Sequence, residues 1–248
     1  MKHLYLFIPL FFIFSSTNAQ KKMRTLEELI NTTEPGWPLV RSWIDSATND
    51  IQILPCDPAR AKEALYHTQV TTRSPMGAII YHTGGLLVDH GWLRILGSGS
   101  AQLDRSMPDW NKGRTFKEFG DASPFLLVAD DVAGGFFAVN GGGLGNDRGS
   151  VYYLSPEHLQ WIDMELTYSE FLLFCFNGKL DNFYQSLRWK DWKQEISQLD
   201  GNKGYSFYPF LFSVEGKDVN KVSRRAVPIA ELFLLYMDAM KQSGNGNG

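Results

Sequence analysis

The amino-acid sequence predicts an α+β fold with a central, mostly antiparallel sheet flanked by N-terminal and C-terminal helices. Helical patterns occupy residues 25–69, short β-rich runs with glycine turns follow up to residue 154, and mainly helical patterns return after them. Because helices and strands fill separate stretches of the chain, the order differs from the alternating order of a parallel α/β sheet.

Three helices are expected before the strands. Thr25 followed three residues later by Glu28 is a capping-box pattern, which predicts a helix start at residue 26. Apolar residues recur at helical spacing in residues 38–49, which open with a proline. An Asp-Pro pair then opens a third helix at residues 57–69.

The middle of the chain has the composition of a β-meander. β-branched and aromatic residues gather in short runs, and glycine-containing turns separate most of these runs. Strands are expected at residues 77–81, 86–88, 92–96, 125–129, 136–139 and 151–154. The polar residues 97–115 and 140–150 are predicted to be long loops.

The chain after residue 155 is predicted to be mainly helical. We expect a helical turn at 158–161, a buried helix at 168–176, an amphipathic helix at 182–199, an aromatic β-like run at 205–214 and a terminal helix at 228–241. The basic residues Lys221, Arg224 and Arg225 are interpreted as part of a solvated loop.

The first 19 residues have the pattern of a secretory signal sequence. A weakly positive start precedes an apolar run at residues 4–14, and small residues follow at 17–19. Cleavage would place the protein in the periplasm or outside the cell, whereas translation from Met23 would leave it in the cytoplasm. Residues 20–242 are then expected to form one domain, and residues 243–248 a disordered Gly- and Asn-rich tail.

Charge and hydropathy exclude some classes of partner. The formal net charge of −3 argues against non-specific nucleic-acid binding, which requires dense positive charge. No segment after the signal sequence is apolar enough to cross a membrane. Cys56 and Cys175 could form a disulfide in an exported protein, but Cys175 lies in an apolar run and is expected to be buried.

No motif in the chain identifies a catalytic reaction. The glycines at 141–145 precede a strand-like run and not a helix, so they indicate a hairpin loop instead of a phosphate cradle. Ser98 lies between glycines but lacks the strand and helix of a nucleophile elbow. The histidines lack metal-ligand spacing, so no metal or cofactor is expected. The pair Asp130-Asp131 precedes two glycines and is interpreted as a turn.

Two groups of residues are candidates for binding a partner. Trp110 lies in a polar loop, and Trp189 and Trp192 lie beside basic residues, so all three are expected at the surface. The long loop at 140–150 is the second candidate, because exposed loops often carry function. Its candidate contact residues are Asn140, Asn146, Asp147 and Arg148.

Several passages resemble an uncharacterised bacterial family, domain-of-unknown-function family 2625. They are the runs at 71–78, 84–99, 134–141, 208–210 and 224–228. The resemblance covers residues 23–241 and implies no known activity. More distantly, residues 134–136, 151–153 and 170–172 resemble the SUKH superfamily, whose members are mostly binding proteins and include toxin-immunity proteins.

Three hypotheses about function follow from these observations. The first is a non-enzymatic module that binds a protein partner. The second is an envelope hydrolase, for which Asp89, His90 and Arg94 are the catalytic candidates because they form the densest polar group of the most specific motif. The third is a glycan-binding protein that uses exposed Trp and Tyr side chains.

Overall fold

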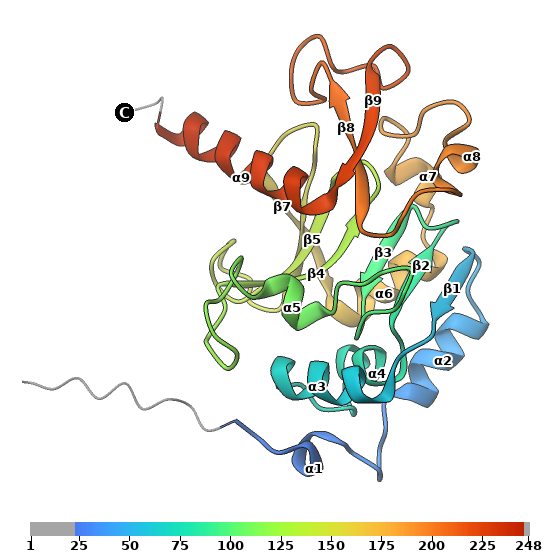
Figure 1. The fold of residues 1–248 in the computed structure, drawn as a ribbon, viewed down its shortest axis with the longest axis vertical. Helices are drawn as coiled ribbons and strands as arrows, with labels where there is room; N and C mark the ends of the chain where they lie inside the picture. Colours follow the sequence, from blue (N-terminus) through green and yellow to red (C-terminus); the bar gives the residue numbers. More distant parts are fainter. Residues whose placement is uncertain (1–22, 246–248) are drawn as a thin grey trace, which may run out of the picture.

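The computed structural model describes residues 23–245 and has the predicted α+β fold. The predicted signal sequence and residues 246–248 lie outside the described residues. Within the described part, neighbouring strands of a seven-stranded sheet are antiparallel, and a separate two-stranded sheet follows later in the chain (Figure 1).

Four helices lie in the N-terminal region, and their starts follow the local capping signals. They are α1 (Leu26–Leu29), α2 (Trp37–Asp45), α3 (Pro58–Thr68) and α4 (Pro75–His82). The capping box at Thr25 is present. The Asp57 carboxylate accepts the N–H groups of Ala59 and Arg60, both at 2.9 Å, and so caps α3.

The strand predicted at residues 77–81 is wrong, because these residues lie in α4. Ser74 caps this helix by accepting the Gly77 N–H at 3.1 Å, and Pro75 occupies its first turn. Ile79 and Ile80 are completely buried. A short helix buried on all sides has the continuous apolar run that is also typical of a buried strand, and periodicity alone does not separate the two.

The large sheet is a meander in chain order. Its strands are β1 (Ile51–Leu54), β2 (Gly85–Val88), β3 (Leu93–Leu96), β4 (Phe125–Asp131), β5 (Phe136–Asn140), β6 (Ser150–Leu154) and β7 (Trp161–Thr167). The structure confirms the predictions for β2 to β6. The sequence analysis missed the two edge strands, β1 and β7, which are only partly buried and therefore lack a clear apolar alternation.

The remaining elements complete the fold. They are α5 (Met107–Asn111), α6 (Tyr168–Asn177), α7 (Leu180–Phe183), α8 (Trp192–Ile196), β8 (Lys203–Tyr208), β9 (Ser223–Pro228) and α9 (Ile229–Asn245). The single helix predicted at 182–199 is wrong, because α7 ends at Phe183 and α8 begins only at Trp192, after Asp191 with its left-handed backbone (φ 65°). Helix α9 continues to Asn245, into residues predicted to form a tail.

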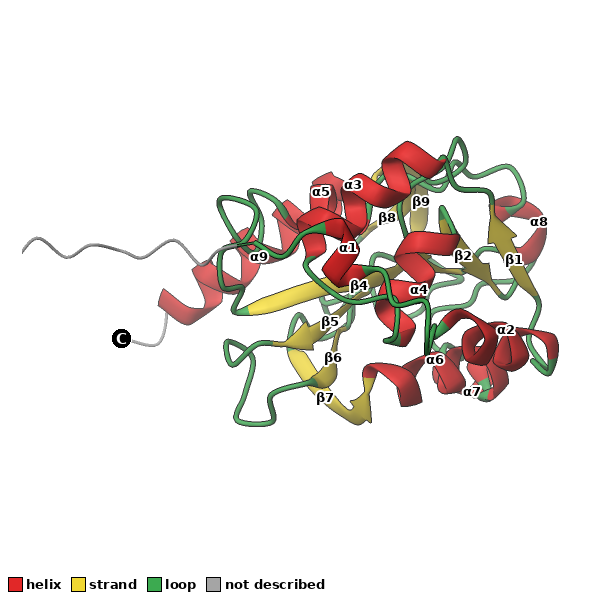
Figure 2. Cartoon of the chain, turned by 90° about the horizontal axis from the view of Figure 1, so that it is seen from below, coloured by secondary structure: helices red, strands yellow, loops and turns green. Residues whose placement is uncertain are grey.

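Both faces of the large sheet are covered. Phe136 and Phe137 of β5 point to opposite faces, and both are completely buried. Phe137 contacts Phe171 of α6 with a ring-centroid distance of 5.0 Å, whereas Phe136 contacts Phe233 of α9 at 5.1 Å. Figures 1 and 2 show α6 and α9 on different sides of the strands. The sheet is thus the middle layer of the core.

The two cysteines are both free thiols. Cys175 is completely buried in α6, as predicted. None of the helices within residues 23–245 has the length and hydropathy needed to cross a bilayer.

Candidate functional site

The three catalytic candidates lie close together in sequence but interact with different partners. Asp89 and His90 form the β2–β3 turn with left-handed backbones (φ 51° and 60°). The Asp89 carboxylate pairs with Arg188 of the segment between α7 and α8. His90 Nδ1 lies 3.6 Å from Asp50 Oδ2 at a half-exposed position.

Arg94, the third candidate, is buried in an ion-pair network. One guanidinium nitrogen lies 2.6 Å from Asp130 Oδ1, and Arg105 pairs with the other oxygen of the same carboxylate. Arg94 also donates to the carbonyl of Lys203, and Arg105 donates to that of Gly201 at 3.0 Å. The network therefore joins β3 and β4 to the segment that enters β8.

The candidates do not share one cavity. His90 and Arg94 line a polar cavity of about 430 Å³ between β2–β3 and residues 196–201, whereas Asp89 lines a different one beside α7. Ser98 also makes a structural contact, because its hydroxyl donates a hydrogen bond to the Thr83 carbonyl at 2.8 Å. The Ser98 side chain is completely buried. These residues therefore make structural contacts with different partners and do not form one common reaction centre.

Asp130 and Asp131 do not form the predicted turn but end strand β4, and both are completely buried. Asp131 accepts hydrogen bonds from the N–H groups of Ala133 and Gly135 and from the Tyr153 hydroxyl, at 2.8–3.0 Å. Burial raises the pKa of Asp131 to about 6. The carboxylate organises the β4–β5 turn, because it holds two backbone N–H groups that have no strand partner.

The three tryptophans expected at the surface are buried. Trp110, Trp189 and Trp192 expose 4%, 2% and 9% of their area. Trp110 was predicted at the surface from its polar loop, and Trp189 and Trp192 from their basic neighbours, but guanidinium groups stack on all three indole rings. Arg114 lies 3.9 Å from the Trp110 ring centroid and Arg224 lies 4.6 Å from that of Trp189. These indoles therefore cannot contact a partner at the surface of this fold.

The loop at 140–150 joins β5 to β6, as predicted from its glycines. Asn140 is 2% exposed and organises the loop from within. Its amide donates to the carbonyls of Gly145 and Asp147, and its oxygen accepts the N–H groups of Gly142 and Leu144, at 2.7–3.1 Å. The other candidate residues, Asn146, Asp147 and Arg148, are exposed at the tip.

This loop is attached to the segment that precedes β4. The N–H groups of Gly141 and Gly143 both donate to the Pro124 carbonyl, at 2.8 and 2.9 Å. A Cβ atom on Gly141 would come within 2.2 Å of the Ser123 carbonyl, so this contact requires glycine. The base of the loop is thus hydrogen-bonded to Pro124, next to residues 120–123, which line a cavity.

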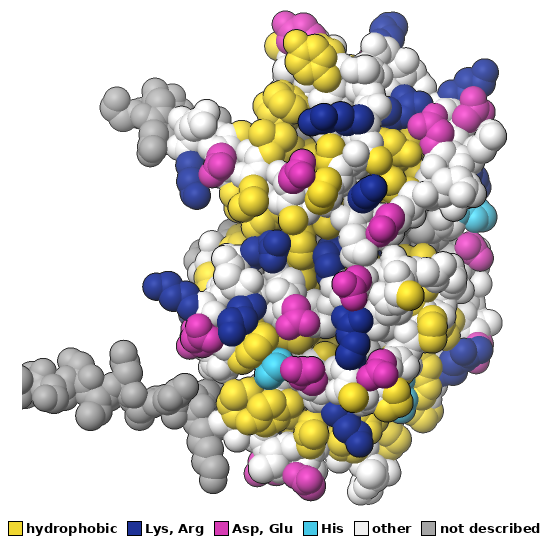
Figure 3. Space-filling model, in the orientation of Figure 1, with side chains coloured by type: hydrophobic (Ala, Val, Ile, Leu, Met, Phe, Trp, Pro, Cys, Tyr) yellow, Lys and Arg dark blue, Asp and Glu magenta, His cyan; other side chains and the backbone are white. Residues whose placement is uncertain are grey.

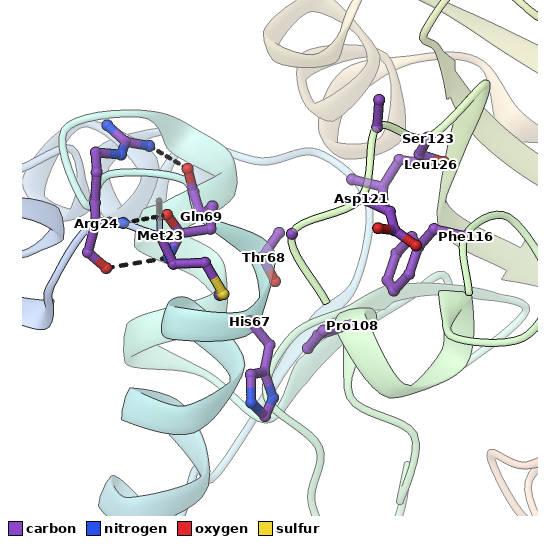
Figure 4. Close-up of a pocket in the computed structure, with 12 residues that line it drawn as sticks. Met23, Arg24, His67, Thr68, Gln69, Pro108, Phe116, Asp121, Ser123 and Leu126 are labelled. Carbon is purple, nitrogen blue, oxygen red and sulfur yellow. Dashed lines mark hydrogen bonds between the residues drawn. The ribbon is translucent and has the colours of Figure 1, made fainter. Parts of the chain in front are cut away.

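That cavity has a volume of about 420 Å³ and lies between the end of α3 and the segment 116–126 (Figure 4). Figure 4 shows Met23, Arg24 and Gln69 on one side and Phe116, Asp121, Ser123 and Leu126 on the other. Its lining residues are Met23, Arg24, His67, Thr68, Gln69, Pro108, Phe116, Gly120, Asp121, Ala122, Ser123 and Leu126.

Side-chain contacts hold the two walls in place. The Arg24 N–H donates to the Gln69 side chain at 2.7 Å, and the Gln69 amide donates to the Arg24 carbonyl at 3.2 Å. The His67 ring stacks on Phe119 with a centroid distance of 3.7 Å and an interplanar angle of 5°. The segment 116–123 is therefore fastened to α3, and the cavity is formed before any ligand arrives.

The sequence analysis missed this cavity. Its lining comes from the N-terminal segment, the end of α3, α5 and the segment before β4, which are far apart in the chain. The only local signal is the pair Phe116 and Phe119, two aromatic residues between polar neighbours.

Comparisons with known proteins place the chain in a family but identify no activity. An uncharacterised protein of Haemophilus influenzae is 48% identical over 189 residues, which is 76% of this chain and 83% of the relative. The putative uncharacterised protein YbfG of Escherichia coli is 43% identical over 211 residues, or 85% and 94% of the two chains.

No solved structure matches the fold, and the SUKH resemblance stays a prediction. The family model described as protein of unknown function DUF2625 matches residues 26–232. This match and the two relatives confirm the resemblance found in the sequence, and the chain belongs to family DUF2625.

Proposed function

We propose that this protein is an exported, non-enzymatic binding module that takes an apolar segment of a protein partner into the cavity beside the 140–150 loop. The observation that carries the proposal is this preformed cavity, whose lining residues 120–123 adjoin Pro124, the residue that holds the ordered base of a loop with an exposed polar tip. Export rests on the pattern of residues 1–19, which lie outside the described residues.

The size and lining of the cavity suit an apolar anchor. Ligand pockets commonly enclose roughly 300–1,000 Å³ and combine apolar walls with a few polar groups. Here Met23, Pro108, Phe116 and Leu126 supply apolar surface, and Asp121 supplies a carboxylate. In protein interfaces, a few side chains that fill such a pocket contribute most of the binding energy.

The loop supplies the polar rim of the proposed interface. Because Asn140 and the Pro124 carbonyl hold its backbone, Asn146, Asp147 and Arg148 can contact a partner without a large loss of backbone entropy. Charged residues at a rim mainly set the rate and specificity of association.

The alternative hypotheses receive less support from the geometry. The hydrolase hypothesis needs Asp89, His90 and Arg94 to act together, but each is held by a different partner. The glycan hypothesis relied on exposed Trp and Tyr side chains. Trp110, Trp189 and Trp192 are buried, so this hypothesis keeps only exposed tyrosines such as Tyr208.

The proposal is tested by selecting peptides from a random displayed library against the purified protein and measuring their affinities by fluorescence polarisation. Ala122 is exposed at the rim of the cavity, so Ala122→Trp should fill the cavity without disturbing the core. We expect this variant to bind the selected peptides at least about tenfold more weakly than the unmodified protein does, since one anchor side chain commonly contributes more than about 1.4 kcal/mol of binding free energy.

The matched control is Ala59→Trp, which adds the same side chain at an exposed position in the first turn of α3, away from the cavity. This variant should bind the peptides like the unmodified protein. Charge reversal by Arg148→Glu should mainly change the association rate. Failure to select any peptide, or equal affinity for Ala122→Trp and the unmodified protein, would refute the proposal.

A further inference from the structure

We propose that the β8–β9 hairpin docks this protein onto an anionic lipid surface. The hairpin comprises residues 203–228, with β8 and β9 paired over their whole length and joined by a long loop. Figure 1 shows the hairpin and its loop at the top of the molecule, beyond the large sheet. This inference is independent of the cavity described above.

The hairpin has a positive charge in an acidic protein. Residues 203–228 contain five basic and two acidic residues, a formal charge of +3, whereas the whole chain has −3. The basic residues are Lys203, Lys217, Lys221, Arg224 and Arg225, and the acidic ones are Glu215 and Asp218. This asymmetry gives the hairpin charge complementarity to an anionic surface.

Three of these cations are available to an external partner. Lys221 pairs with Asp218 at 2.9 Å, and Arg224 pairs with Glu195 of α8. Across residues 23–245, no carboxylate lies within ion-pair distance of Lys203, Lys217 or Arg225. Basic residues beside a membrane are attracted to the negative surface potential of anionic lipids.

The hairpin also exposes large apolar side chains toward the end that carries Lys217, whereas Lys203 lies at the opposite end of β8. Tyr208 exposes 74% and Val214 exposes 82% of its area, the largest fractions among the large hydrophobic residues of the described chain. Leu234 of the adjoining helix α9 exposes 57%. Figure 3 shows hydrophobic side chains at the end of the hairpin, with Lys and Arg side chains and one acidic side chain around them.

The loop that follows Tyr208 and carries Val214 is anchored to the protein. Phe210 and Phe212 stack with a centroid distance of 5.0 Å, and Phe212 contacts Tyr236 of α9 at 6.4 Å. On the inner side of β8, Phe207 is buried against Trp189. Apolar surface exposed on an anchored protrusion is not explained by the packing of the core.

A bilayer fits this combination better than an acidic protein does. Tyr is enriched at membrane–water interfaces, where the ring lies among headgroups and neighbouring cations contact anionic lipids. A protruding apolar tip needs a complementary groove in a protein partner, whereas a lipid surface deforms around it. Docking also leaves the cavity open, because α3, which contributes one wall, lies toward the opposite end of the molecule (Figure 1).

The test measures sedimentation of the purified protein with vesicles of phosphatidylcholine alone or mixed 7:3 with phosphatidylglycerol. We expect binding to the anionic vesicles only, and its loss in high salt because salt screens the surface charges. Removal of two cations by Lys217→Ala with Arg225→Ala should weaken binding about thirtyfold. Tyr208→Ser with Val214→Ser should weaken it roughly tenfold.

The matched controls remove the same kinds of side chain elsewhere. Ile162→Ser changes an exposed apolar residue on β7, and Lys179→Ala removes an exposed cation before α7. Both should bind like the unmodified protein. Unchanged binding by the two hairpin variants, or no preference for anionic vesicles, would overturn the proposal. Equally tight binding to soluble poly-glutamate would also overturn the proposal, since it would indicate that the basic hairpin binds an acidic protein partner.

Discussion

The buried ion-pair network offers a direct test of the structural role that we assign to Arg94. Asp130 is completely buried and pairs with both Arg94, which exposes 1% of its side chain, and Arg105, which exposes 11%. Asp130→Asn keeps the size of the side chain but leaves two guanidinium groups without their shared counter-charge. Breaking a buried ion pair in this way commonly costs about 3–5 kcal/mol.

We therefore expect Asp130→Asn to lower the free energy of unfolding by about 3–5 kcal/mol. For a chain of this size, each kcal/mol shifts Tm by roughly 2–4 °C, so Tm should fall by about 6–20 °C. Urea unfolding followed by tryptophan fluorescence measures the first quantity, and calorimetry measures the second. Asp104→Asn is the matched control, because the Asp104–Arg60 pair is exposed and should contribute less than about 1 kcal/mol.

A double-mutant cycle separates the network from a general effect of substitution. If Arg94 and Asp130 stabilise each other, then Arg94→Met with Asp130→Asn should cost less than the sum of the two single variants. The expected coupling energy is about 1–3 kcal/mol. A cost below about 1 kcal/mol for Asp130→Asn, or additive costs, would show that the Arg94–Asp130 pair does not stabilise the fold.

Three further predictions follow from buried polar groups. The pKa of Asp131 is about 6 in the folded protein, against an ordinary value of 3.8, so the folded state binds this proton more tightly than the unfolded state does. The free energy of unfolding should therefore fall by about 3 kcal/mol as the pH rises from about 4 to 6. Asp131→Asn should lack this slope in urea titrations across that range, and an unchanged slope would contradict the assignment. Asn140→Ala removes four hydrogen bonds from the 140–150 loop and should speed amide exchange at residues 141–149, whereas Asn146→Ala at the exposed tip should not. Burial raises the pKa of the Cys175 thiol and shields it. A thiol reagent should therefore modify half-buried Cys56 in the folded protein and reach Cys175 only on unfolding. Equal modification rates of the two thiols would mean that α6 opens readily.

The candidate site was only partly accessible to sequence reasoning. The loop at 140–150 could be predicted because its glycines stand between two β-rich runs, and the structure confirms the hairpin. The cavity beside it could not, since contacts such as His67 with Phe119 join segments that are far apart in the chain. The hairpin at 203–228 was half predicted: its aromatic strand was recognised, but its basic strand was interpreted as a loop.

The sequence by itself determined the elements whose hydrogen bonds are local. The capping box at Thr25 and the Asp57 cap set helix starts through bonds to residues two or three positions away, and glycine turns separate the central strands. Only the tertiary structure decided the burial of Trp110 and Trp189 and the pairing of Arg94 with Asp130. A basic residue or a tryptophan has the same local pattern whether it faces solvent or stacks in the core, and the choice depends on partners that only the folded chain brings together.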